Sequence, residues 1–198
     1  MKNFTVDVPG NTNAQLATEV SPGKACGTEV SAISFHPKDG NLWGWSEECG
    51  LVKINITDPG QSTLVYPYAE DSFAACLSDD QKVRRQYSSH IEDLTWDANG
   101  EFIYVANGGD VQKYAVTEDN GVITTATLLE THAVGGNVET VEMLPDGETL
   151  IINQNGSRNL KTLSGGVVTK AHADLGKYND IEAVAACVSC RATLRYGW

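Results

Sequence analysis

The chain has 198 residues, of which 41% are hydrophobic and 20% are charged, as in an ordinary folded globular protein. Its formal net charge of −12 at pH 7 disfavours nucleic acid as a partner, because the polyphosphate backbone would be repelled. No apolar run reaches the ~18 residues that a membrane-spanning helix needs, so we expect no membrane span.

The N-terminus reads MKNFTVDVPG, which predicts a strand followed by a Pro-Gly turn. No apolar run follows Lys2, so we expect no signal peptide in this chain. The repeats further along the chain explain why the sequence opens on a strand.

Three segments share a pattern that predicts an alternating strand, a turn with Pro, Asp or Asn before Gly, and a second strand. They read VSAISFHPKDGNLWGWS (30–46), IEDLTWDANGEFIYVANGG (91–109) and VETVEMLPDGETLIINQNG (138–156), and a shorter copy, IEAVAACVSCRATLRYGW (181–198), ends the chain. Each of the first three copies is followed by a second strand pair with a lysine near its start. These pairs read LVKINITDPGQSTLVY (51–66), VQKYAVTEDNGVITTATLLE (111–130) and LKTLSGGVVTKAHADL (160–175).

The fourth copy lacks a second strand pair, and the N-terminal segment, with Lys2 in the same place, supplies one. The sequence therefore predicts four units of four strands. Their approximate ranges are 30–66, 90–130, 137–175 and 180–198 together with 1–20.

Units of this length with four antiparallel strands are typical of β-propeller blades, which stack around an axis. We therefore predict an all-β fold, a four-bladed β-propeller closed by N- and C-terminal strands that share one blade. An open partial propeller closed by a neighbouring chain is the alternative.

The segments GEFIYVANGGDVQKYAVTEDNG and LPDGETLIINQNGSRNL resemble the blades of the lactonase-like and YVTN-type propeller families. The resemblance covers the two middle units best. It implies a propeller fold. Those families usually have more blades than four, so their activities are not carried over to this chain.

The predicted first strand of each unit carries a polar residue at its second position: Ser31, Glu92, Glu139 and Glu182. In a closed ring these positions would converge near the central channel. Carboxylates close together repel one another unless a cation neutralises them, and a ring of oxygen ligands suits Ca²⁺. Alternatively, each glutamate accepts backbone N–H groups from the adjacent blade.

The chain has five cysteines, Cys26, Cys49, Cys76, Cys187 and Cys190, which favour an oxidising compartment. We expect a disulfide among the first three, with Cys49–Cys76 preferred. The Cys187-Val-Ser-Cys190 motif lies in a predicted turn, where a local disulfide or two free thiols fit better than a zinc site.

Three residues are candidates for ligand contacts on the surface. Trp45 and Trp198 align at the end of the predicted second strand of the first and fourth repeats. An exposed indole at this place can stack on a sugar or anchor a protein. His90 directly precedes a predicted first strand, near the channel mouth.

Two functions remain open from the sequence. The first is a non-enzymatic binding or structural module of an extracellular or cell-surface protein, such as an adhesion domain. It would bind a protein or a carbohydrate, could self-associate, and could be stabilised by a cation. The second is a metal-assisted hydrolase of lactonase or esterase type.

Overall fold

The computed structural model describes residues 30–46, 50–57, 62–66 and 90–172, and their regular structure consists of β-strands. These strands form three four-stranded antiparallel sheets. The first sheet contains β1 (Val30–Phe35), β2 (Leu42–Ser46), β3 (Gly50–Ile54) and β4 (Thr63–Tyr66). The second contains β5 (Ile91–Trp96), β6 (Phe102–Asn107), β7 (Asp110–Asp119) and β8 (Val122–Ala133). The third contains β9 (Val138–Met143), β10 (Leu150–Gln154), β11 (Leu160–Ser164) and β12 (Val167–His172).

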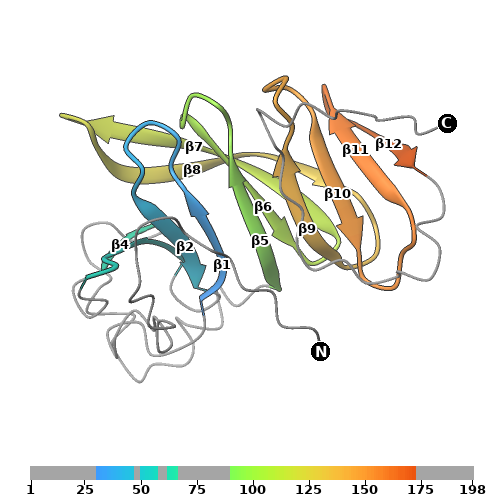
Figure 1. The fold of residues 1–198 in the computed structure, drawn as a ribbon, viewed down its shortest axis with the longest axis horizontal. Coiled ribbons are helices and arrows are strands. Elements are labelled where there is room, and N and C mark those ends of the chain that lie inside the picture. Colours follow the sequence, from blue (N-terminus) through green and yellow to red (C-terminus); the bar gives the residue numbers. More distant parts are fainter. Residues whose placement is uncertain (1–29, 47–49, 58–61, 67–89, 173–198) are drawn as a thin grey trace, which may run out of the picture.

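Each sheet is a meander in which the strands pair in the order of the sequence, and the sheets stand side by side in that order (Figure 1). Neighbouring sheets meet along their first strands, because β5 contacts both β1 and β9. Meanders packed face to face in this way are propeller-type blades. The prediction of an all-β, propeller-type repeat protein is therefore confirmed, and we call the sheets blades 1, 2 and 3.

The fourth predicted blade, residues 180–198 with 1–20, lies outside the described residues. No candidate for a membrane-spanning helix is found within the described ranges.

We call the side of a blade that faces the preceding blade its leading face and the opposite side its trailing face. The trailing face of blade 1 and the leading face of blade 2 form one apolar core, which contains Trp43, Trp45 and Leu51 from the first and Leu94 and Trp96 from the second. Blade 3 packs its own leading face on blade 2 through a second core. Alternation along each strand therefore divides every blade into these two faces, as a period of two requires.

The first hairpin turns of blades 1 and 2 are joined by His36, which is buried. Its Nε2 lies 3.2 Å from the carbonyl oxygen of Gly100, and its ring meets Trp96 edge-on with centroids 4.7 Å apart. Gly100 has a φ of +63°, and a Cβ there would lie 2.2 Å from the His36 Nε2 atom. Only glycine fits both the backbone conformation and the space at this position.

The leading face of blade 1 differs from those of blades 2 and 3. The register makes Ile33 equivalent to Leu94 and Val141. The exposed fraction of these side chains is 58% for Ile33 but 2% for Leu94 and 0% for Val141. Phe35, two residues further along β1, is 64% exposed. Blade 1 thus leaves exposed the part of its inner strand that the other blades bury against a preceding blade.

Candidate functional site

The polar positions that begin the first strands are structurally equivalent in the three described blades. Each pairing shifts register at this point: Val30 is followed by Ala32 in the pairing of β1, Ile91 by Asp93 in β5 and Val138 by Thr140 in β9. The skipped residues are Ser31, Glu92 and Glu139, so each is the extra residue of a β-bulge. A bulge re-aims the side chain of its extra residue. Glu182, the fourth residue of the predicted set, lies outside the described residues.

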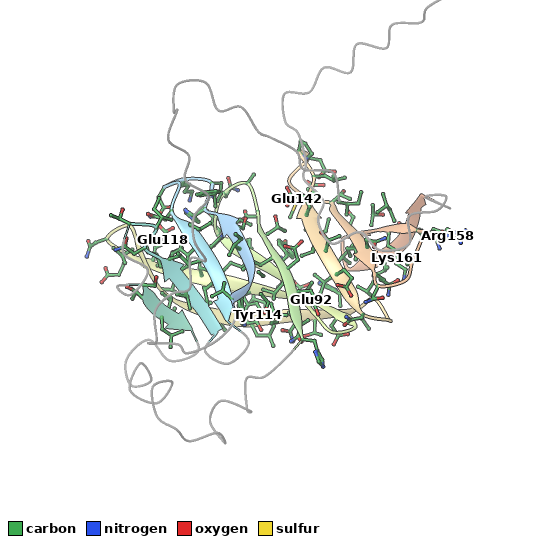
Figure 2. All side chains as sticks on the ribbon, turned by 60° about the horizontal axis from the view of Figure 1, so that its bottom comes forward. Glu92, Tyr114, Glu118, Glu142, Arg158 and Lys161 are labelled. Atoms are coloured by element: carbon green, nitrogen blue, oxygen red, sulfur yellow. The ribbon has the colours of Figure 1, made fainter. Side chains whose placement is uncertain are left out.

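The glutamates at the bulges are partly buried, and the Glu139 Oε1 atom accepts a hydrogen bond of 3.0 Å from the Asn137 amide. Glu92 lies near the beginning of β5, whereas Glu142 lies near the end of β9, at the opposite end of the inner strands (Figure 2). Over residues 30–46, 50–57, 62–66 and 90–172, no three His, Cys, Asp or Glu side chains form a group that could hold a metal ion. The predicted cation site, which includes Glu182, stays a prediction.

Asp93, the neighbour of Glu92, links blade 2 to blade 3. Its Oδ2 atom accepts hydrogen bonds from the Thr140 hydroxyl at 2.8 Å and from the Val141 backbone N–H at 3.0 Å, and its Oδ1 accepts one from the Leu94 N–H at 2.8 Å. Burial raises the pKa of Asp93 to about 6, and nearby Glu142 contributes in the same direction, although the hydrogen bonds lower it.

Thr95, two residues after Asp93 in β5, makes a second link between blades 2 and 3. Its hydroxyl donates to the Glu142 Oε2 at 3.0 Å and accepts from the Met143 backbone N–H at 3.4 Å. Blade-to-blade hydrogen bonding is one of the two roles expected for the bulge glutamates. Between blades 2 and 3, Asp93 and Thr95 make such bonds, because the bulge places the residue after Glu92 on the trailing face. The role of the bulge glutamates stays a prediction.

Two of the predicted surface residues lie in described parts of the chain. His90 is exposed, and its backbone carbonyl accepts a hydrogen bond of 2.7 Å from Gly108. The prediction for Trp45 is wrong, because its side chain is only 4% exposed. Trp45 lies on the trailing face of blade 1 and packs against Tyr114 of blade 2, with ring centroids 5.1 Å apart. Trp198 and the five cysteines, Cys26, Cys49, Cys76, Cys187 and Cys190, lie outside the described residues.

A cleft of about 620 Å³ lies between blades 2 and 3, and sequence analysis did not predict it. We call it the interblade cleft. Blade 2 contributes aromatic and charged side chains, and blade 3 contributes two leucines and two turns. The principal lining residues are Phe102, Tyr104, Lys113, Glu130 and His132 from blade 2, and Glu148, Leu150, Leu163 and Ser164–Gly166 from blade 3.

Three charged or polar side chains are coupled along one wall of the interblade cleft. The Glu130 carboxylate lies between two nitrogens, with Oε1 3.7 Å from the Lys113 Nζ and Oε2 3.1 Å from the His132 Nε2. The Lys113 Nζ also lies 4.4 Å from the centroid of the Phe102 ring and 5.8 Å from that of Tyr104. Burial raises the pKa of the Tyr104 phenol, although Lys113 lowers it. The phenol therefore remains a hydrogen-bond donor at neutral pH.

Between blades 2 and 3, smaller side chains occupy two positions that hold aromatic side chains between blades 1 and 2, and one of them, Leu163, lines the cleft. Ala106 stands where blade 1 has Trp45, since each pairs with the residue after the bulge. Leu163 stands where blade 2 has Tyr114, and each pairs with the second strand of its blade at the same level. The tight Gly165–Gly166 turn, with φ values of +55° and +77°, adds no side chain to the rim. In the sequence, only the smaller residues at these equivalent positions of the repeats could have indicated the cleft.

No protein-family model matches the sequence, and no curated protein matches it. Among solved structures, the chain is similar to the β-propeller domain of Cps50 (Swd1) from Myceliophteria thermophila, with 12% identity, 76% of this chain and 45% of that one covered, and a TM-score of 0.49. A Bacteroides ovatus auxiliary nutrient binding protein matches with 10% identity, 71% and 35% coverage and a TM-score of 0.49. A Bacteroides uniformis protein described as a 6-phosphogluconolactonase matches with 15% identity, 74% and 41% coverage and a TM-score of 0.44. The chain thus spans less than half the length of these structures.

Proposed function

We propose that the protein is a non-enzymatic binding module and that the interblade cleft holds its ligand. The observation that carries this proposal is the lining of the cleft, which combines two aromatic rings with a coupled Lys113–Glu130–His132 row. The cleft volume of about 620 Å³ is within the range of small-molecule sites.

A carbohydrate is the ligand class that matches this lining best. Sugar hydroxyls both donate and accept hydrogen bonds, and the cleft offers the Glu130 carboxylate as an acceptor and the Lys113 ammonium and Tyr104 hydroxyl as donors. The apolar face of a sugar ring can pack on the aromatic side chains Phe102 and Tyr104. Lys113 and Glu130 are already paired in the cleft, so a neutral ligand leaves this pair of charges compensated.

The test is a titration of the full chain with glucose, galactose, mannose, N-acetylglucosamine, maltose and cellobiose, followed by calorimetry and ligand-observed NMR. Glu130→Gln should weaken binding about tenfold or more, because a charged acceptor is lost. Glu130 is exposed over about half of its side chain, so the fold should be retained. Glu101→Gln is the matched control, because Glu101 is exposed and does not line the cleft.

Binding that is equal in wild type and Glu130→Gln would place the ligand elsewhere. Failure of every sugar to bind would refute the carbohydrate assignment. NMR spectra of the recovered ligand also test the non-enzymatic part of the proposal, which conversion of any sugar would contradict.

We also propose that a fourth blade, built from residues 180–198 and 1–20, closes the ring against blade 1. Two observations support it. The apolar side chains Ile33 and Phe35 are exposed where equivalent residues of blades 2 and 3 are covered. The segment that begins Ile181-Glu182 also repeats the sequence that forms a bulged first strand at Glu92 and Glu139.

Calcium binding at the bulge glutamates and an extracellular or cell-surface location complete this proposal. The net charge of −12 supports cation binding, since carboxylates in excess favour a counter-ion. The five cysteines support an oxidising compartment.

A further inference from the structure

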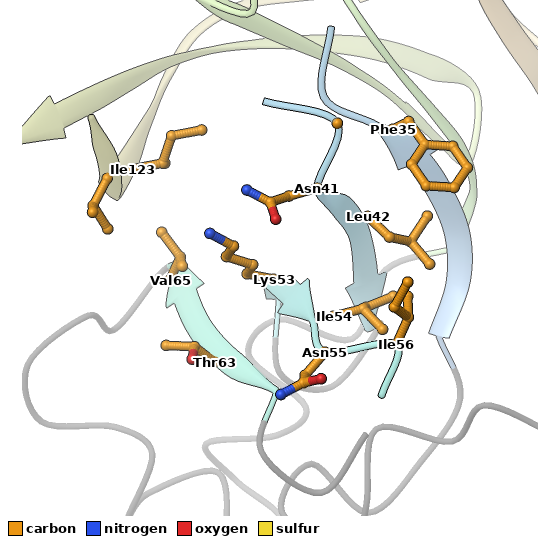
Figure 3. A pocket seen from close by; sticks show the side chains of 12 residues that line it. Phe35, Asn41, Leu42, Lys53, Ile54, Asn55, Ile56, Thr63, Val65 and Ile123 are labelled. Atoms are coloured by element: carbon orange, nitrogen blue, oxygen red, sulfur yellow. The ribbon is translucent and has the colours of Figure 1, made fainter. Parts of the chain in front are cut away.

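A second pocket, of about 450 Å³, lies at the end of blade 1 and reaches the β7–β8 hairpin of blade 2. We call it the end pocket; it shares no lining residue with the interblade cleft. Half of its twelve lining residues are aliphatic, and Asn41, Asn55 and Thr63 are polar. Lys53 lies between Val65 and Ile123 on one side and Leu42 and Ile54 on the other (Figure 3). Three further apolar side chains at the pocket are more than half exposed: Phe35, Ile56 and Val122.

Lys53 is the one charged side chain among the described residues that line the end pocket. Its Nζ lies 6.0 Å from the centroid of the Trp43 ring. No carboxylate of the described ranges forms an ion pair with it. An ammonium group in such a wall favours an anionic partner, because the other lining residues are apolar or neutral and carry no charge that balances it.

Lys113, the equivalent lysine of blade 2, has a carboxylate partner that no described residue supplies to Lys53. Lys53 pairs with Trp43 across β2 and with Thr63 across β4, just as Lys113 pairs with Tyr104 and Glu130. The Lys113 Nζ therefore has the Glu130 carboxylate at 3.7 Å, whereas a threonine occupies the same position in blade 1. Among the described residues of blade 1, no carboxylate therefore takes toward Lys53 the place that Glu130 has toward Lys113.

We propose that the end pocket binds an amphipathic carboxylate, a small molecule with an aliphatic body and one carboxylate group. The carboxylate pairs with the Lys53 ammonium, in the role that Glu130 has toward Lys113. The aliphatic body lies on Ile54, Val65 and Ile123 and is bounded by the exposed side chains Ile56 and Val122. This site is independent of the proposed sugar site, because the two share no residue.

The test titrates the full chain with octanoate, hexanoate and 1-octanol at pH 7.5 by calorimetry, with tryptophan fluorescence as a second readout because Trp43 lies beside Lys53. Each buried CH₂ strengthens binding about fourfold, so octanoate should bind about fifteenfold more tightly than hexanoate. Loss of the charge-assisted contact should make 1-octanol bind about tenfold more weakly than octanoate.

Two variants and one control locate the site. Lys53→Met keeps the aliphatic stem, and it should reduce octanoate affinity about tenfold while leaving 1-octanol affinity unchanged. Ile56→Ser alters an exposed side chain and should weaken both ligands without loss of stability. Lys38→Met is the control, because Lys38 is exposed, lies 3.9 Å from Glu101 and does not line the pocket.

Three results would overturn the proposal. One is the absence of octanoate binding to folded wild-type protein, which is expected if another part of the chain fills the pocket. Another is equal octanoate affinity in Lys53→Met and wild type. The third is Ile56→Ser binding both ligands as wild type does, which would place them outside this pocket.

Discussion

Replacing Asp93 by asparagine should change how the free energy of unfolding depends on pH. Burial raises the pKa of this carboxyl from 3.8 to about 6 in the folded protein, so the folded state binds the proton more tightly than the unfolded state does. Because the folded pKa is the higher one, the free energy of unfolding falls as pH rises from about 4 to 6.

The size of this effect follows from the two pKa values. Their difference is about 2 units, which at 1.36 kcal/mol per unit corresponds to about 3 kcal/mol. Near pH 4.5 the unfolded chain has already lost most of its proton from this group, so about 2 kcal/mol of the change falls between pH 4.5 and 7.5. Asp93→Asn removes the charge and keeps an oxygen that can accept from Thr140 and Val141. It should therefore gain about 2 kcal/mol relative to wild type over this interval.

The assay is urea unfolding at pH 4.5 and pH 7.5, followed by the fluorescence of the four tryptophans. Asp146→Asn is the control. Hydrogen bonds from Glu148 and Thr149 hold the pKa of exposed Asp146 below its usual value, so its contribution to stability is already present at pH 4.5. The difference between Asp146→Asn and wild type should thus be the same at both pH values. If Asp93→Asn behaved in the same way, the argument that Asp93 is a buried blade-to-blade contact would be refuted.

Four further predictions concern stability. Leu94→Ala should cost about 2 to 5 kcal/mol of unfolding free energy. Ile33→Ala should cost a similar amount of unfolding free energy, because the proposed fourth blade covers this side chain. A loss below about 0.5 kcal/mol in denaturant titrations would mean that the ring is open there. Trp45→Ala should cost about 3 to 5 kcal/mol, and unchanged denaturation would mean that the indole is not packed between blades. A calcium chelator should lower the melting temperature of wild type, and Glu139→Gln should reduce that shift; no shift on chelation would remove the calcium proposal.

The sequence predicted the strands and their grouping because alternation and turn residues are local signals. Each predicted first turn contains an aspartate whose side chain accepts backbone N–H groups in the structure. These are Asp39 with Asn41, Asp97 with Glu101 and Phe102, and Asp146 with Glu148 and Thr149. Such turns form from residues close in sequence, so they can be predicted without tertiary structure.

The bulges explain why the side-chain roles were harder to predict. A bulge adds one residue to a strand, so every residue beyond it changes face relative to a simple count. This is why Asp93, and not Glu92, accepts the Val141 N–H of the next blade. Lys161 shows a related shift: it pairs with Ile152, one position away from the level of Lys53 and Lys113. Its Nζ donates to the Val134 carbonyl of blade 2 at 3.0 Å instead of lying on the trailing face.

The two pockets show how one repeated scaffold produces different sites. Lys53 and Lys113 hold the same position in their blades, and each lies near an aromatic ring of the neighbouring strand. The residue across the next strand differs, since Glu130 pairs with Lys113, whereas Thr63 offers Lys53 no carboxylate at the same position. The first environment suits a neutral polar ligand, and the second suits an anion with an apolar body. Because the two lysines pair at the same level of their blades, a carboxylate at position 63 would lie across from Lys53 as Glu130 lies across from Lys113. Thr63→Glu should therefore abolish octanoate binding at the end pocket while leaving the blade folded, because Thr63 is exposed.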